Sequence, residues 1–160
     1  MPGEVVADFG VGSGAYTINV AQYIGNHGVV YAFDIQAELL KKVSRLAVEK
    51  GLNNIKIMTA DFELPSSSKL KEEAVDLIII ANVLFQLKNK ENILREAFKI
   101  LKKTGRILIV DWSDSFGGIG PQPSDVVKME TAQKLAESIN FKLVKTLQAG
   151  DHHYGLLFKK

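Results

Sequence analysis

The sequence predicts an α/β fold: a doubly wound, mostly parallel sheet with helices on both faces. The first observation is that short apolar runs alternate with segments that place apolar residues at helical spacing. Strands separated by helices of roughly ten to fifteen residues pair in parallel through right-handed crossovers. The second observation is a break in this alternation at the end of the chain, where two apolar runs are joined by a short polar link. The sheet is therefore predicted to be mixed, with a terminal hairpin.

The first half of the chain is predicted to supply three strands and two helices. The strands cover Val5–Phe9, Gly28–Asp34 and Asn54–Asp61, and the helices cover Ala15–Ile24 and Gln36–Lys50. The second helix is followed by Gly51, a residue type that commonly ends helices. The second and third strands each end in an acid. Both carboxylates are therefore expected at the edge of the sheet where parallel strands bind ligands.

The second half is predicted to supply four more strands and two more helices. The strands cover Val75–Asn82, Gly105–Trp112, Phe141–Gln148 and His153–Lys160, and the helices cover Asn89–Leu101 and about Ser124 to Ile139. The fourth strand is continuously apolar, which is typical of a strand covered on both faces. The last two strands must be antiparallel, because a parallel return needs a crossover of about a dozen residues. The glycine- and proline-rich connection Ser113–Asp125 is long and lies at the ligand-binding edge, where such loops are often functional.

Composition limits the classes to which the chain can belong. Its 160 residues suggest a single domain, and 46% hydrophobic with 24% charged residues allow a packed core. The formal net charge of +2 is too small to indicate a nucleic-acid partner by itself. The absence of cysteine excludes disulfides, thiolate metal sites, iron–sulfur clusters and cysteine nucleophiles, and no metal site is predicted. No signal peptide or membrane-spanning run is recognisable, so a cytoplasmic protein is expected.

The stretch "DFGVGSGAY" (residues 8–16) follows the first strand and is the strongest candidate for a ligand-binding loop. A nucleoside-triphosphate loop is excluded because it needs Gly-Lys-Ser/Thr, whereas Gly14 is followed by Ala15 and Tyr16. The relaxed dinucleotide pattern is satisfied by Gly10, Gly12 and Ala15, with an acid about 20 residues further on. This short pattern alone leaves a dinucleotide as an alternative.

Three features argue against the dinucleotide. Asp8 precedes the first glycine and would repel a pyrophosphate, whereas it would attract an ammonium group. Gly14 adds a third alternating glycine. The terminal hairpin replaces the second nucleotide-binding half that a dehydrogenase would need. A dehydrogenase is therefore disfavoured.

The ordered set of motifs resembles the class I S-adenosylmethionine-dependent methyltransferases. "VVADFGVGSG" resembles their Asp/Glu-x-Gly-x-Gly-x-Gly motif, "VVYAFDI" the second motif and "IMTADFE" the third. "VDLIIIANVLFQL" is similar to their fourth strand and following turn, and "NILREAFKILKKTGRILIVDW" to the next helix and strand. The resemblance covers nearly the whole chain. It implies a seven-stranded sheet in the order 3-2-1-4-5-7-6, with strand 7 antiparallel.

The same resemblance implies S-adenosylmethionine as the cofactor and S-adenosylhomocysteine as its product. Asp34 would bind the ribose hydroxyls, Asp61 would reach the adenine amino group, and the glycine loop would hold the methionine end. The cofactor-binding residues expected on this basis are Asp8, Gly10, Gly12, Gly14, Asp34, Ile35, Ala60, Asp61, Phe62 and Asn82. Several of these residues also have a structural alternative: Asp61 and Asn82 could simply cap the turns that follow their strands.

The expected reaction is methyl transfer to a nitrogen or oxygen acceptor by in-line displacement. Such a reaction needs a general base only if the acceptor is protonated at rest. Asp111 and His153 are weak candidates for that base, and no catalytic residue is assigned. The structural alternative for Asp111 is a cap of a neighbouring turn, and His153, like His152, could be a solvated residue of the hairpin.

"VLFQL" and the Gly-Pro-Gln-Pro loop most resemble the small-molecule branch that includes the ubiquinone/menaquinone methyltransferases. A small-molecule acceptor is therefore expected, while RNA or protein acceptors stay open. The basic cluster Lys99, Lys102, Lys103 and Arg106 lies around a predicted helix end, where cations complement the helix dipole. This explanation is preferred over contact with RNA.

The predicted domain, 1–160, lacks the N-terminal lid helices usual in the family, because its first strand begins at about residue 4. An open cofactor cleft with exposed apolar surface would favour self-association, so a homodimer is one expected arrangement. The main alternative to an enzyme is a methyltransferase-like binding or scaffold module without activity of its own.

Overall fold

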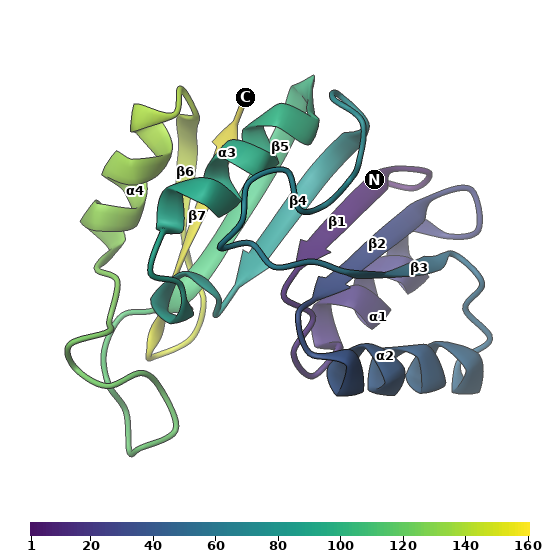
Figure 1. Ribbon diagram of the computed structural model, residues 1–160, viewed down its shortest axis with the longest axis horizontal. Helices are drawn as coiled ribbons and strands as arrows, with labels where there is room; N and C mark the ends of the chain where they lie inside the picture. The colour runs from purple at the N-terminus through teal and green to yellow at the C-terminus, as the bar shows by residue number, and fades with distance from the viewer.

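Seven strands form one mixed sheet in the order β3-β2-β1-β4-β5-β7-β6 in the computed structural model, which describes residues 1–160 (Figure 1). The strands are β1 (Val5–Phe9), β2 (Val29–Asp34), β3 (Ile55–Thr59), β4 (Val75–Ala81), β5 (Leu101–Trp112), β6 (Lys142–Gln148) and β7 (His153–Lys159). Strands β1 to β5 pair in parallel, and β7 is antiparallel to both β5 and β6. The predicted order and the predicted terminal hairpin are confirmed.

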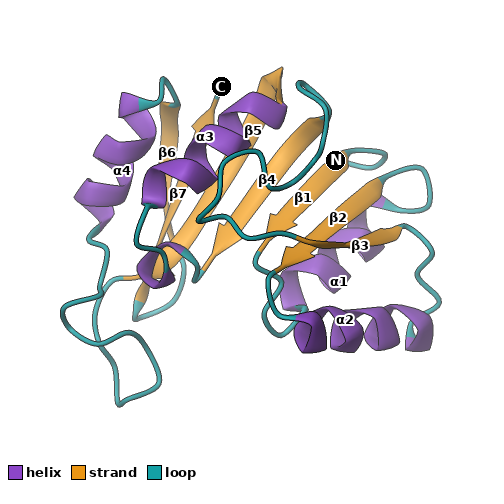
Figure 2. Ribbon diagram, in the orientation of Figure 1, coloured by secondary structure: helices purple, strands orange, loops and turns teal.

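The helices lie in two layers on opposite faces of the sheet (Figure 2). They are α1 (Ala15–Ile24), α2 (Ala37–Glu49), the short 3-10 helix η1 (Leu84–Gln86), α3 (Lys90–Ile100) and α4 (Met129–Ser138). Neighbouring residues of β1 show the two layers, because successive side chains of a strand point to opposite faces. Val6 packs in a cluster with Ala21 and Ile24 of α1, whereas Ala7 belongs to the larger cluster that includes residues of α3 and α4. Both side chains are fully buried, as expected for a parallel sheet covered on both faces.

Two boundaries differ from the sequence-based prediction by four residues or more, and the others differ by one or two residues at most. Strand β5 begins at Leu101 rather than Gly105, because Leu101 already pairs with Val75 before an irregularity in the register moves the pairing to Leu77 and Arg106. Helix α4 begins at Met129 rather than near Ser124, so the irregular connection is longer than predicted. The short helix η1 was not predicted. None of the helices is both long enough and apolar enough to cross a lipid bilayer.

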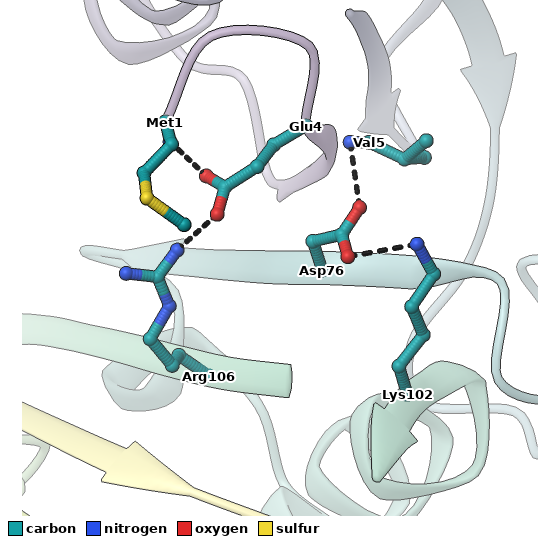
Figure 3. Close-up of polar contacts among 6 residues, drawn as sticks. All are labelled: Met1, Glu4, Val5, Asp76, Lys102 and Arg106. Atoms are coloured by element: carbon teal, nitrogen blue, oxygen red, sulfur yellow. Dashed lines mark hydrogen bonds and ion pairs between the residues drawn. The ribbon is translucent and has the colours of Figure 1, made fainter. Parts of the chain in front are cut away.

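The amino end of the sheet is held by paired charges (Figure 3). Asp76 accepts hydrogen bonds from the ammonium of Lys102 at 2.7 Å and from the Val5 N–H at 2.9 Å. The carboxylate of Glu4 accepts from the guanidinium of Arg106 and from the chain's terminal ammonium group. Two members of the basic cluster therefore form ion pairs between strands, which the helix-dipole explanation did not anticipate.

Both edge strands of the sheet carry lysine, and one of them is irregular. Strand β6 is mostly exposed, and its pairing with β7 is interrupted by a register shift between Leu143 and Lys145. Strand β3 forms the opposite edge and carries Lys56, whose ammonium lies 5.3 Å from the centre of the Tyr31 ring. Lysine side chains therefore lie on both edges of the sheet, with a short strand at one edge and a register shift at the other.

Candidate functional site

A cavity of about 440 Å³ opens at the carboxyl ends of β1, β2 and β4, the edge of the sheet where the sequence predicted the site. This volume lies within the range of roughly 300–1,000 Å³ that is usual for small-molecule sites. Eight of the ten predicted cofactor-binding residues line it: Gly10, Gly12, Asp34, Ile35, Ala60, Asp61, Phe62 and Asn82. Asp8 and Gly14 do not line it and lie in the supporting structure behind the loop.

The glycine loop forms one wall of this cavity, and its backbone conformation requires glycine. Gly10 has φ of 95°, and a Cβ added there would lie 2.4 Å from Cγ2 of Val83. Gly14 has φ of 87°, and its Cβ would lie 2.9 Å from Cγ2 of Val43 on α2. Around Gly12 the space is open, so a ligand can approach the backbone there. Gly10 and Gly14 thus allow the loop to pack closely against Val83 and Val43, and Gly12 leaves room for a ligand to approach the backbone.

Asp34 ends β2 and faces the cavity. Its Oδ1 accepts the Gln36 N–H at 2.9 Å, and its Oδ2 lies 3.4 Å from the Gly12 nitrogen. These contacts fix the carboxylate at the cavity wall and leave acceptor sites on both oxygens, since an ionised carboxylate has about four lone-pair directions. The geometry therefore suits a ligand that donates two neighbouring hydroxyl hydrogen bonds.

Asp61 and Phe62 form a second wall after β3. Oδ1 of Asp61 accepts the Glu63 N–H at 2.9 Å, which is the turn-capping contact considered as the structural alternative. Its Oδ2 makes no hydrogen bond within the protein, so a cap and a ligand contact are compatible. Phe62 stacks on Phe9 with ring centres 4.1 Å apart. This stacking anchors the wall to the core.

Asn82 follows β4 in a left-handed conformation, with φ of 58°. Its N–H donates to the Val110 carbonyl at 2.8 Å, and its own carbonyl accepts from Nε2 of Gln86 at 2.6 Å. The Oδ1 atom of its side chain is buried without a partner. A buried acceptor usually has a donor, so this orphan atom at the cavity wall suits a ligand that donates a hydrogen bond.

Glu63 connects two walls of the cavity and was not predicted. Its carboxylate accepts the backbone N–H groups of Lys88 at 2.5 Å and Asn89 at 3.0 Å, and its carbonyl accepts from Nδ2 of Asn92 at 2.5 Å. The hydrogen bonds from Asn89 and Lys88 lower the pKa of Glu63, so it is ionised at neutral pH. Glu63 therefore joins the segment after β3 to the segment between η1 and α3.

Asp8 lies buried on β1 behind the loop. Its Oδ2 accepts the Thr17 hydroxyl at 2.5 Å, and its Oδ1 has no partner. Burial raises the pKa of Asp8 to about 7, although the Thr17 hydrogen bonds oppose the change. The charges of Asp8 and Asp34 repel each other, and this adds to the increase. No cationic side chain of the protein therefore stabilises the ionised form of Asp8.

The charged residues that line the cavity are all acidic. Three carboxylates line it, from Asp34, Asp61 and Glu63, and no lysine, arginine or histidine does. Burial, and then the charge of Asp8, raises the pKa of the cavity-lining Tyr16, which therefore stays neutral. Such a cavity attracts a cationic ligand and repels a pyrophosphate.

Both weak candidates for a catalytic base lie outside the cavity. Asp111 is fully buried, and its carboxylate accepts the N–H groups of Leu84 at 2.9 Å and Trp112 at 2.8 Å. Burial raises its pKa to about 6 against the effect of these bonds. This position fits the structural alternative, a cap of η1. His153 packs against Trp112 with ring centres 4.1 Å apart, and burial, followed by the charge of His152, lowers its pKa.

Several cavity-lining residues were missed by sequence reasoning. They lie on the loop and the start of α1, at the start of α2, after β3, and from the end of β4 to just beyond η1: Val11, Ser13, Ala15, Tyr16, Gln36, Leu39, Glu63, Ala81, Val83, Gln86 and Leu87. The loop residues could have been included from their position between the glycines. The residues around η1 had no signal, because their approach to the cavity depends on how the chain turns after Asn82.

Comparison with known sequences identifies relatives over most of the chain. A sequence model of the methyltransferase domain matches residues 1–156. Aklanonic acid methyltransferase DauC from Streptomyces sp. is 31% identical over 105 residues, which are 66% of this chain and 46% of that protein. The ubiquinone/menaquinone biosynthesis C-methyltransferase UbiE from Ectopseudomonas mendocina is 32% identical over 114 residues, which are 70% of this chain and 43% of that protein. The chain thus spans a little less than half the length of these relatives.

The fold also has close counterparts among solved structures. The crystal structure of an S-adenosylmethionine-dependent methyltransferase from Aquifex aeolicus superposes with a TM-score of 0.86 and 24% sequence identity. The match covers 98% of this chain and 82% of the Aquifex chain. At this level of identity the similarity establishes a shared fold.

Proposed function

The chain belongs to the class I S-adenosylmethionine-dependent methyltransferase family, and from this premise we propose that it transfers a methyl group from S-adenosylmethionine to a small apolar acceptor. The observation that supports this most is the charge of the cavity at the sheet edge, which is lined by three acids and no basic residue. S-adenosylmethionine carries an ammonium and a sulfonium group and no phosphate. A dinucleotide would instead bring a pyrophosphate to the same carboxylates.

The residues that line the cavity fit this cofactor group by group. Asp34 has free acceptor sites for two ribose hydroxyls. The unpartnered oxygen of Asp61 and the exposed side chain of Ile35 suit the amino edge and the flat face of an adenine ring. The buried, unpartnered oxygen of Asn82 suits a donor from the methionine end, whereas Asp8 lies behind the loop and does not line the cavity. The positions of these atoms make the assignment specific to this cavity.

The bound cofactor supplies an electrophilic methyl group on a positively charged sulfur. The residues of this chain therefore have to position the acceptor and exclude water, and holding two reactants in line is worth about 7–11 kcal/mol. The acceptor would supply the electron pair for the new bond to the methyl carbon, from a lone pair of nitrogen or oxygen or from the π electrons of a ring carbon, and the electrons of the broken carbon–sulfur bond would stay on the sulfur of S-adenosylhomocysteine. The acceptor then releases its proton to water. No titratable side chain of the cavity is assigned as a base in this step.

We propose a wider range of acceptor atoms than the sequence suggested. Nitrogen and oxygen were the expected acceptors, but UbiE is named a C-methyltransferase, so carbon is included. An electron-rich ring carbon next to an ionised hydroxyl is a sufficient nucleophile without a protein base. Quinols of the naphthalene series are therefore the first acceptors to test.

Calorimetric titration with S-adenosylhomocysteine tests the cofactor site directly. We expect binding in roughly the micromolar range and none of NADH at the same concentrations. Asp34→Ala should weaken binding by roughly 10- to 100-fold, since hydrogen bonds to a charged group are worth about 1.5–3 kcal/mol. Asp151→Ala, which removes an exposed acid of the β6–β7 turn, is the matched control and should bind as the unchanged protein does.

Methyl transfer itself is tested with S-adenosylmethionine labelled in the methyl group and reduced 1,4-naphthoquinone as acceptor. Mass spectrometry of the product distinguishes methylation of carbon from methylation of oxygen. Binding of S-adenosylhomocysteine without transfer to any acceptor would favour the binding or scaffold module. Tight binding of NADH would contradict the proposed cofactor.

A further inference from the structure

A second groove, of about 710 Å³, lies beside the cofactor cavity. One wall consists of the segment from Phe85 to Lys90, and the other of residues 124–128 with Thr131 of α4. Gln86 and Leu87 line both the groove and the cofactor cavity, so the two spaces meet at these side chains. The groove therefore begins where an acceptor for the cofactor's methyl group would have to lie.

The groove combines an apolar surface with ammonium groups. Phe85, Leu87, Val126 and Val127 provide the apolar surface, and Lys88, Lys90 and Lys128 provide the charges. Lysines come from both walls, so an occupant would have cations on two sides. The neighbouring cofactor cavity has the opposite charge, because its only charged lining residues are acids.

Part of this positive charge is not neutralised within the protein. The ion pairs of the chain involve neither Lys88 nor Lys128, and the ammonium of Lys90 donates to the Leu87 carbonyl at 2.5 Å. Asp125 is the one acid in the groove lining, and it accepts from the hydroxyl of Ser124 at 3.3 Å. Glu63, on the side toward the cofactor cavity, accepts the backbone N–H groups of Lys88 and Asn89, and the charges of Lys88 and Lys90 also act on its carboxylate. Glu63 therefore offsets part of the charge of these two lysines, while Lys128 on the other wall forms no ion pair.

From this arrangement we propose that the groove binds the methyl acceptor and that the acceptor is an apolar acid: a flat ring system with a carboxylate or an ionised hydroxyl. The inference rests on the proposed function and adds the chemical class of the substrate. The apolar wall would bury the ring system, and the lysines would attract the acidic group and select against neutral analogues. A cationic donor and an anionic acceptor would then occupy neighbouring sites of opposite charge.

The test uses two probes of the same shape, naphthalene-2-carboxylate and naphthalene-2-carboxamide, titrated into protein saturated with S-adenosylhomocysteine. We expect the carboxylate to bind roughly tenfold more tightly than the amide at low salt, and the preference to shrink as salt screens the lysines. Amide NMR signals of residues 85–90 and 124–131 should shift on binding.

Variants distinguish the groove lysines from the general charge of the protein. The double variant Lys88→Gln/Lys128→Gln should remove most of the preference for the carboxylate. The control Lys145→Gln, on edge strand β6, should retain it. Affinity for S-adenosylhomocysteine should be unchanged in both, so a failed cofactor site and a failed acceptor site give different results.

Equal binding of the two probes, binding of neither, or shifts confined to other segments would each overturn the proposal. A single-stranded RNA 12-mer provides a further arm. If the RNA binds more tightly than the carboxylate and loses affinity in the same double variant, the groove is a phosphate-binding surface and the acid acceptor is wrong.

Discussion

The acids at the two ends of the sheet have opposite electrostatic surroundings. Asp76, at the amino end, is partly buried, but hydrogen bonds from Lys102 and Val5 outweigh this burial and lower its pKa. Asp8, toward the carboxyl end of the neighbouring strand, has only the Thr17 hydroxyl, and burial raises its pKa to about 7. The difference is the presence of a cation. The amino end pairs its acids with cations, while the carboxyl end leaves Asp8 without one.

The largest expected effect is that of Asp8 on how stability depends on pH. Its pKa is higher in the folded than in the unfolded state, so the folded protein loses stability as pH rises from about 4 to about 7. A pKa displaced from 3.8 to about 7 corresponds to roughly 4 kcal/mol, since one pKa unit is worth about 1.4 kcal/mol. Asp8→Asn should remove most of this loss. Urea unfolding at pH 4 to 8 measures it, and an unchanged slope in the variant would contradict the assignment.

The next effect concerns the backbone of the carboxyl end. Gly10→Ala would place a methyl group 2.4 Å from Cγ2 of Val83, at a φ of 95° that alanine rarely adopts. Strain and overpacking together should cost about 2–4 kcal/mol of stability. Because Val83 lines the cofactor cavity, affinity for S-adenosylhomocysteine should fall as well. Gly12→Ala is the comparison, since a Cβ there meets nothing within 4 Å and only the backbone strain applies.

A smaller effect is expected at the amino end. Asp76→Ala removes the acceptor of both the Lys102 ammonium and the Val5 N–H and should cost about 1–2 kcal/mol at pH 7. The folded-state pKa of Asp76 is lowered, so this contribution is present above the unfolded pKa and is lost as pH falls below about 4. Lys102→Ala should cost less, because the lysine side chain is 40% exposed. Thermal unfolding at pH 3 and pH 7 distinguishes the two.

The smallest expected effect is that of the second ionic contact at the same end. Glu4→Gln removes the charge opposite Arg106 and the terminal ammonium while keeping the shape of the side chain. The expected loss is about 0.5–1 kcal/mol at low salt and less at 0.5 M salt. A loss that does not change with salt would mean that packing, rather than charge, holds this contact.

The sequence was sufficient for the sheet and for the acids at its carboxyl edge. Alternating apolar runs and helices determine parallel pairing, and the short "AGDH" link forces the last two strands to be antiparallel. Asp34 and Asp61 could be placed because each ends a strand predicted from the sequence. Parallel strands bring their carboxyl ends together, so strand ends can be located without knowing any side-chain contact.

The residues that the sequence could not place depend on contacts between distant segments. Glu63 forms part of the site because backbone groups of Lys88 and Asn89 come to its carboxylate. The sequence gives no indication of that approach. Asp111 follows the same strand-end rule as Asp34, yet its carboxylate bonds the N–H of Leu84 in η1, which was not predicted. The groove beside the cavity likewise joins residues 85–90 to residues 124–131, so its lysines look like ordinary solvated residues in the sequence.

The irregular edge strand β6 has a consequence for the solubility of the protein. An exposed strand edge offers unpaired N–H and C=O groups, and another molecule can extend the sheet there and start a cross-β aggregate. Lys142 and Lys145 would have to face an incoming strand, and the register shift beside Lys145 interrupts the regular ladder that such a strand needs. We therefore expect the lysines and the register shift of β6 to oppose polymerisation of this chain, which has 46% hydrophobic residues, through its own sheet.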